Sequence, residues 1–101
     1  MNKMESLFEK IKKFIIEERW EYGFELTTKT SLQEDLDIYG DDASEILIKF
    51  CNEFNVNYEK FRFDDYFRPE SSWIDFFKKK KKYKKFTISN LIKAIESGEL
   101  K

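Results

Sequence analysis

Apolar residues recur at helical spacing in three separate segments of this chain, and that periodicity limits the fold more than any other sequence feature. It predicts helices from Lys3 to about Trp20, from Asp42 to near Asn55, and between Thr87 and Gly98. A helix with one apolar face must bury that face against a neighbour. With 101 residues, we therefore predict a single mainly α domain over residues 1–101, folded as a small bundle of three to four helices.

The core is predicted from the apolar stripes of these helices. Leu32 and Leu36, which precede the second helix and are four residues apart, are expected to face the same core. The stripe residues expected to point inward are Leu7, Phe8, Ile11, Phe14, Ile15, Ile46, Leu47, Phe50, Cys51, Phe54, Ile88, Leu91, Ile92 and Ile95.

Capping residues indicate where the helices and turns begin and end. Ser31 followed by Glu34 fits a capping box for a short turn, and Asp42 with an acid three residues later fits the N-cap of the second helix. Thr87 is the expected N-cap of the last helix, and Gly98 its C-cap. After Pro69, Ser71 or Ser72 could cap a further short helix that carries Trp73, Ile74, Phe76 and Phe77.

The segment Tyr58–Phe67 has aromatic residues with charges between them, and its pattern is compatible with a short strand, an aromatic-anchored loop or one helical turn. If it is a strand, Lys84–Phe86 is the expected partner in a small two-stranded β element. Its rings could line a ligand pocket, but a small domain commonly uses large side chains to close its core. We favour the core interpretation.

Charge is distributed unevenly along the chain. Residues 1–77 carry 10 Lys/Arg and 18 Asp/Glu, whereas residues 78–101 carry 9 Lys and 2 Glu. The run Lys78–Lys85 holds seven lysines in eight residues and could bind nucleic acid or an anionic membrane. The acidic body would repel such polyanions, so we favour solvated or self-compensating charge.

Several site chemistries are excluded by composition. The chain has no histidine and one cysteine, Cys51, so it lacks an internal disulfide, the usual zinc ligand set and any Ser-His or Cys-His catalytic pair. We therefore predict that it is not an enzyme and has no cofactor or metal, and that Cys51 is a buried structural thiol. The N-terminal sequence is not a signal peptide and no apolar run matches a membrane helix, so the expected location is the cytoplasm.

The order of these elements resembles an acyl carrier protein, through Leu32, Asp35, Leu36, Glu45 and the pair Glu53-Phe54. In that family the serine that carries phosphopantetheine lies five residues after the Asp and fourteen before the Phe. Both spacings lead to Gly40, which has no hydroxyl, and Tyr39 replaces the usual preceding Asp. The resemblance therefore implies a carrier-like fold without the prosthetic group. Ser44 is the nearest hydroxyl and is a remote alternative.

The chain also resembles a small bacterial group called domain of unknown function 1493, which looks carrier-like. The likeness covers most of residues 5–98 and consists of the turn Gly40–Asp42, the pattern Phe-x-Phe-x-x-Tyr-Phe over Phe61–Phe67, and the final helix motif over Phe86–Leu91. It implies a fold, and only weakly a function.

Six carboxylates occur within twelve residues around the expected start of the second helix: Glu34, Asp35, Asp37, Asp41, Asp42 and Glu45. Their spacing does not fit an EF-hand calcium loop. They could be helix caps on a solvated acidic surface, or a face that binds basic partners, as the carrier resemblance implies. Asp41, Asp42 and Glu45 are the candidate partner-binding residues.

The function that these observations favour is non-catalytic binding of another protein with a basic surface. An immunity or inhibitor protein for a basic toxin, and an atypical acyl carrier modified at Ser44, are the alternatives. Binding of nucleic acid or membrane through Lys78–Lys85 is disfavoured by the acidic body. The sequence gives no indication of the oligomeric state.

Overall fold

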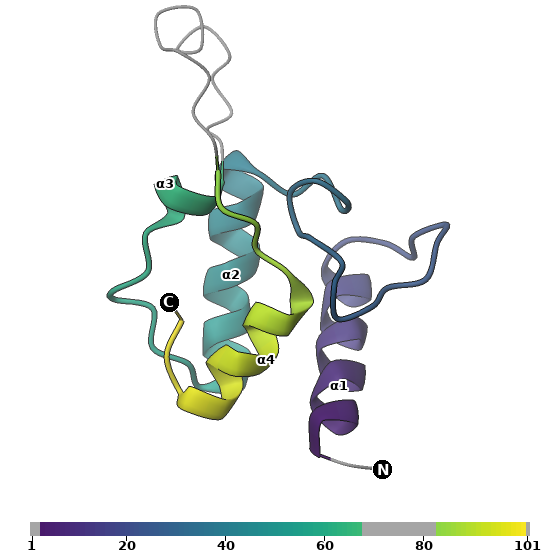
Figure 1. The fold of residues 1–101 in the computed structure, drawn as a ribbon, viewed down its shortest axis with the longest axis horizontal. Helices are drawn as coiled ribbons and strands as arrows, with labels where there is room; N and C mark the ends of the chain where they lie inside the picture. Colours follow the sequence, from purple (N-terminus) through teal and green to yellow (C-terminus); the bar gives the residue numbers. More distant parts are fainter. Residues whose placement is uncertain (1–2, 68–82, 101) are drawn as a thin grey trace, which may run out of the picture.

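Four helices make up the regular structure in a computed structural model of the chain, which describes residues 3–67 and 83–100. They are α1 (Lys3–Glu18), α2 (Gly40–Phe54), α3 (Phe63–Tyr66) and α4 (Ile88–Ser97) (Figure 1). The mainly α class is confirmed. The predicted short helix around Trp73 and the lysines from Lys78 to Lys82 lie outside the described residues. In the described parts of the chain, no helix is long and apolar enough to cross a membrane.

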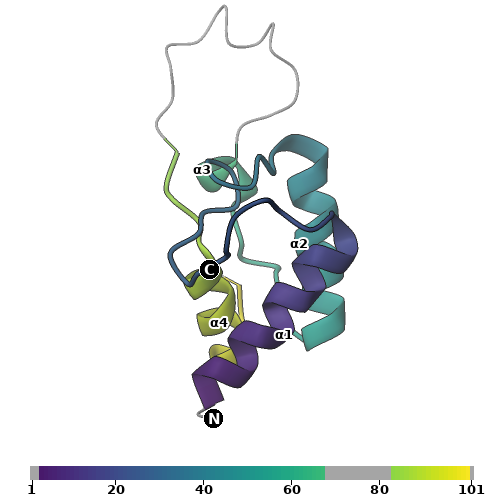
Figure 2. The same cartoon turned by 90° about the vertical axis from the view of Figure 1, so that its right-hand side faces the viewer.

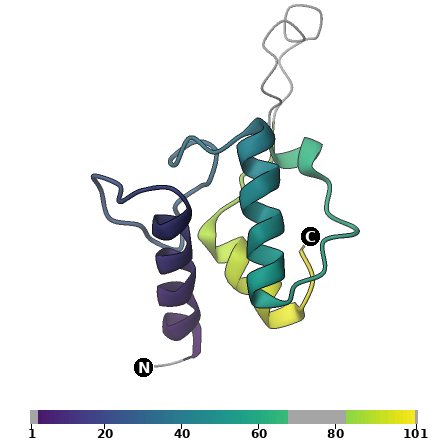
Figure 3. The same cartoon turned by 180° about the vertical axis from the view of Figure 1, so that it is seen from behind.

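The three long helices surround one apolar core. α1 and α2 run in opposite directions, and α4 packs against α1 (Figures 1 and 2). Seen from behind, the long loop that follows α1 leads over to the start of α2 (Figure 3). The end of α1 and the start of α2 therefore lie at the same end of the molecule.

The predicted stripes do form the core. The residues that each stripe buries completely or nearly so are Ile11, Ile15, Ile46, Leu47, Phe50, Cys51, Ile88, Leu91 and Ile92. Leu32 and Leu36 are buried with them, as predicted. The ring of Phe14 reaches across from α1 and meets Phe50 edge-on at a centroid distance of 5.9 Å. Leu7, Phe8, Phe54 and Ile95 are partly buried at the margin of this core.

The start of α2 differs from the prediction. The helix begins at Gly40, and its N-cap residue is Tyr39, not Asp42. Gly40 has φ of 58°, a left-handed value that glycine adopts easily, and the first helical hydrogen bond runs from the Ala43 N–H to the Tyr39 carbonyl at 3.3 Å. Asp42 thus lies inside the first turn, where its carboxylate is turned toward α1.

The predicted capping box at Ser31 is formed with a different partner. The Ser31 N–H donates to Asp35 Oδ2 at 2.8 Å, and the Asp35 N–H donates to Ser31 Oγ at 3.1 Å. Glu34 is exposed and is not part of this pair. The segment that follows Ser31 is a turn and not a helix, so four residues, rather than three, separate the reciprocal partners.

The predicted ends of α2 and α4 are otherwise confirmed, whereas α1 ends at Glu18, two residues before the predicted end near Trp20. The Thr87 N–H donates to Asn90 Oδ1 at 2.9 Å at the start of α4, and Gly98 ends that helix with φ of 80°. Asn55 ends α2 in the left-handed conformation. The C-terminal end of the chain lies close to the end of α2, because the Leu100 N–H donates to the Asn57 carbonyl at 2.8 Å.

The two-stranded β element is not formed. Within residues 3–67 and 83–100 the structure has two isolated bridges, Ser31 with Thr87 and Asn57 with Glu99, and no strand. The ambiguous aromatic segment instead forms the single turn α3. Lys84 still lies beside it, since its N–H donates to the Asp65 carbonyl at 2.9 Å.

Candidate functional site

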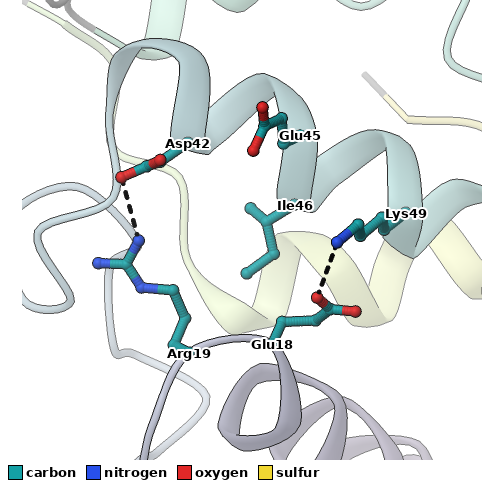
Figure 4. A pocket seen from close by; sticks show the side chains of 6 residues that line it. All are labelled: Glu18, Arg19, Asp42, Glu45, Ile46 and Lys49. Carbon is teal, nitrogen blue, oxygen red and sulfur yellow. Dashed lines mark hydrogen bonds and ion pairs between the residues drawn. The ribbon is translucent and has the colours of Figure 1, made fainter.

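Two ion pairs join the end of α1 to α2. Arg19 Nη1 donates to Asp42 Oδ2 at 3.3 Å, and Lys49 Nζ donates to Glu18 Oε2 at 3.2 Å (Figure 4). Between these pairs lies an open hollow of about 80 Å³. Its lining consists of Glu18, Arg19, Asp42, Glu45, Ile46 and Lys49.

The three candidate partner-binding residues lie on the first turns of α2, and all are exposed. They differ in what they contact. Asp42 is paired with Arg19, whose side chain is only 12% exposed, so this carboxylate has a structural role at the junction of the two helices. Asp41 and Glu45 form no ion pair with any described residue, and Glu45 faces the hollow (Figure 4). These two carboxylates are therefore the available part of the predicted site.

The remaining acids of the same region do not assemble into a metal site. Asp35 is engaged by Ser31, and Glu34 points to solvent. Across residues 3–67 and 83–100, no three acidic or thiol side chains come close enough together to hold a metal ion. The acids are close together in sequence, but they belong to two different elements, the turn after Ser31 and the start of α2. Their carboxylates therefore lie apart on the surface.

Position 40, the expected attachment position, is conformationally unsuited to a serine. Gly40 has φ of 58°, and a side chain at this backbone conformation costs about 1–2 kcal/mol. Ser44 is one turn further along α2 and is half-buried. The apolar cavity between α1, α2 and α4 has a volume of about 10 Å³, at the lower limit for one water molecule. This cavity is thus too small to hold an acyl chain.

A row of surface aromatics just after the end of α1 was not foreseen from the sequence. Trp20, Tyr22 and Phe24, here called the aromatic row, have ring centroids 5.5 Å apart for the first pair and 5.6 Å for the second. Trp20 is 55% exposed and Phe24 is 50% exposed. The available signal was the position of the three rings at every second residue, with Glu21 and Gly23 between them, a pattern typical of a half-buried strand.

A second aromatic group closes the other side of the domain. Phe61, Phe63, Tyr66, Phe67 and Phe86, here called the closing cluster, are buried or partly buried. Phe61 stacks on Tyr66 at 5.2 Å and meets Phe86 edge-on at 5.4 Å. These rings pack on one another, as the core interpretation of the aromatic segment predicts. Tyr58, from the same segment, is instead exposed.

Cys51 is a free thiol buried in α2. Burial raises the pKa of its thiol from 9.0 to about 11, because the thiolate is poorly solvated there. The sulfur therefore stays protonated at neutral pH and is a poor nucleophile.

Compared with known proteins, the sequence matches a protein family. The family described as "Protein of unknown function (DUF1493)" matches residues 3–100. No curated protein and no solved structure matches the chain. The acyl-carrier resemblance gains no support from these comparisons and rests on the residue pattern alone. Because the match spans nearly the whole sequence, the chain belongs to the DUF1493 family.

Proposed function

We propose that this chain is a non-catalytic interaction module of acyl-carrier-like design, which carries no phosphopantetheine and binds a protein with a basic surface. The observation that supports this most is the position of Asp41 and Glu45. Both are exposed on the first turns of α2, and neither is paired with a described residue. Carboxylates held in this way can attract and orient basic side chains of a partner.

The ion pairs beside these residues support a binding role because they fix the surface before a partner arrives. Arg19 and Asp42 hold the end of α1 against the start of α2, and Lys49 with Glu18 does the same about two turns further along α2. A surface that needs no rearrangement loses less conformational entropy on binding. Such a surface suits recognition rather than chemistry, since the chain has no histidine and its one thiol is protonated.

The first test of this proposal is capture of a partner from a lysate of the source organism. Asp41→Lys/Glu45→Lys is expected to abolish capture, and moderate salt to weaken it, since exposed charges are screened. The matched control is Glu53→Lys/Glu96→Lys, which changes the net charge equally at exposed acids elsewhere. Asp42 is left intact because of its bond to Arg19.

Three outcomes contradict the proposal. Capture that is unchanged in the Asp41/Glu45 variant removes the acidic face from the interaction. Equal loss of capture in the Glu53/Glu96 control means that the net charge of the protein, and not the acidic face, determines binding. Loss confined to a Lys79→Gln/Lys80→Gln/Lys81→Gln variant, which we expect to bind normally, transfers the function to the lysine run and favours nucleic acid or membrane.

The second test concerns the absence of the prosthetic group. The protein is coexpressed with a phosphopantetheinyl transferase and its intact mass is measured. We expect no added mass, since Gly40 offers no hydroxyl. Added phosphopantetheine that maps to Ser44 would establish the atypical carrier instead.

The capture experiment also tests the other alternative. A captured basic toxin would identify the chain as an immunity protein that uses the same acidic face.

A further inference from the structure

The aromatic row is an exposed apolar surface that core packing does not explain. Trp20 and Phe24 are about half exposed, although large aromatic side chains are usually withdrawn from water. They belong to one short loop, so their rings form a continuous patch beside the end of α1. Exposed patches of this kind, bordered by polar residues, commonly mark interaction sites.

The row is held in a fixed arrangement. The Tyr22 hydroxyl donates to the Leu36 carbonyl at 3.2 Å, which ties the middle ring to the chain near the start of α2. Arg19 Nε donates to Tyr22 Oη at 3.3 Å, and the Arg19 guanidinium lies 4.4 Å from the Trp20 ring centroid. Trp, Tyr and Arg are the residues most enriched among those that dominate binding energy at interfaces.

The charges around the row indicate what it binds. Glu21 lies between Trp20 and Tyr22 in the sequence, and Glu25 follows Phe24. Both are exposed, and neither forms an ion pair with a described residue. Glu45 lies close by, because it lines the same hollow as Arg19, whose guanidinium lies over the Trp20 ring. A second copy of the chain docked here by a two-fold axis would bring like carboxylates together, which is unfavourable. A cationic partner is complementary.

Arg19 shows which cation suits this surface. Its guanidinium carbon lies over the Trp20 ring, 4.4 Å from the centroid, while one of its nitrogens bonds to Asp42. An arginine from outside could make the same two contacts, with an exposed ring of the row and a carboxylate beside it. Lysine would keep the ion pair but could not stack as a flat group.

We propose that the aromatic row and the carboxylates around it bind an arginine-bearing segment of another protein. This proposal rests on the proposed interaction role and names the apolar half of that surface and the side chain it receives. It differs from simple charge attraction because it requires the rings as well as the acids.

The test uses full-length protein carrying Trp73→Phe, so that Trp20 is its one tryptophan, and a short labelled peptide in which arginine alternates with alanine. Binding is expected to shift Trp20 emission to the blue and to raise the anisotropy of the peptide. A lysine version of the peptide is expected to bind about fivefold more weakly, because it forgoes guanidinium stacking.

Substitutions then separate rings from charges. Trp20→Ala and Phe24→Ser are each expected to weaken binding of the arginine peptide about fivefold. Tyr58→Ala, at an exposed aromatic outside the row, is the matched control and is expected to change nothing. Circular dichroism verifies the fold of every variant.

Each contrary result has a distinct meaning. No binding of the arginine peptide at millimolar concentration overturns the inference, while partner capture still tests the proposed function separately. Equal binding of both peptides by all variants overturns it too, since charge alone is then enough. Self-association that Phe24→Ser abolishes assigns the row to a contact between copies, which also refutes the proposal.

Discussion

The aromatic row and the closing cluster have similar ring spacing and opposite exposure. Adjacent rings are 5.5 and 5.6 Å apart in the row, and 5.2 to 5.4 Å apart among Phe61, Tyr66 and Phe86 in the cluster. Trp20 is nevertheless 55% exposed, whereas Phe86 is 2% exposed. The contact between rings is therefore not what buries them.

The difference lies in how many parts of the chain meet at each group. The cluster draws on two stretches distant in sequence, and its Phe86 carbonyl accepts a hydrogen bond from the Leu32 N–H at 2.9 Å, which adds a third. The row comes from one loop and is tied to a remote segment through Tyr22 and Leu36. Rings supplied by one local segment cover one another on one side and leave the other side to solvent.

The largest expected effect is on the buried side of this comparison. Phe86→Ala should lower the free energy of unfolding by about 3–5 kcal/mol, because it removes a buried ring that touches Phe61, Tyr66 and Phe67. Urea unfolding followed by circular dichroism measures it. A loss below about 1 kcal/mol would mean that the cluster collapses easily around the gap and is not a tightly packed closure.

A pH dependence tests how well the same core excludes water. The Cys51 pKa is about 11 in the folded chain and about 9.0 in the unfolded chain. Above pH 9 the unfolded state loses the thiol proton while the folded state keeps it, so stability falls as pH rises. The full effect, reached near pH 11, is about 2–3 kcal/mol.

Cys51→Ala is the control for this measurement, since lysines and tyrosines also titrate at high pH. Subtracting its unfolding free energy at each pH isolates the thiol contribution. Parallel curves for the wild type and Cys51→Ala would show that the thiol is hydrated in the folded state, and that α2 is more open to water than its burial indicates.

The helices and the core were predictable because they follow from periodicity. The stripes of α1, α2 and α4 specify burial at a fixed spacing, and the left-handed end at Gly98 is a local property of glycine. Leu32 and Leu36 were placed correctly for the same reason, although their segment is a turn.

The features that were missed depend on contacts between distant residues. Asp42 fits an N-cap by sequence, but Arg19 draws its carboxylate away and the helix starts at Gly40. The alternation in the row resembles a strand, yet no strand lies beside it in the described chain, so its rings remain on the surface. From the sequence, Asp41 and Glu45 were predicted as candidate binding residues, which stays a prediction, and the aromatic row was not recognised.

A smaller effect on the free energy of unfolding is expected at Gly40, where α2 begins. Gly40→Ser should cost about 1–2 kcal/mol, since serine must adopt a positive φ there. Gly40→Asn should cost less, because asparagine tolerates this conformation. Urea unfolding of both variants measures these two free-energy differences. A Gly40→Ser protein as stable as the wild type would indicate that this backbone relaxes, and that glycine is not required to start α2.

The smallest effect is expected in the aromatic row itself. Trp20→Ala and Phe24→Ala should each change the free energy of unfolding by no more than about 0.5 kcal/mol, since about half of each ring already contacts water and neither ring lies in the core. Urea unfolding monitored by far-ultraviolet circular dichroism is the suitable measurement, because Trp20 fluorescence is lost in one variant. A loss above about 2 kcal/mol for either variant would show that the row supports the fold, and the contrast with the closing cluster would fail. A negligible loss of stability combined with weaker arginine-peptide binding would separate the two groups by role: rings joined from distant segments hold the fold together, and rings from one loop are left available to a partner.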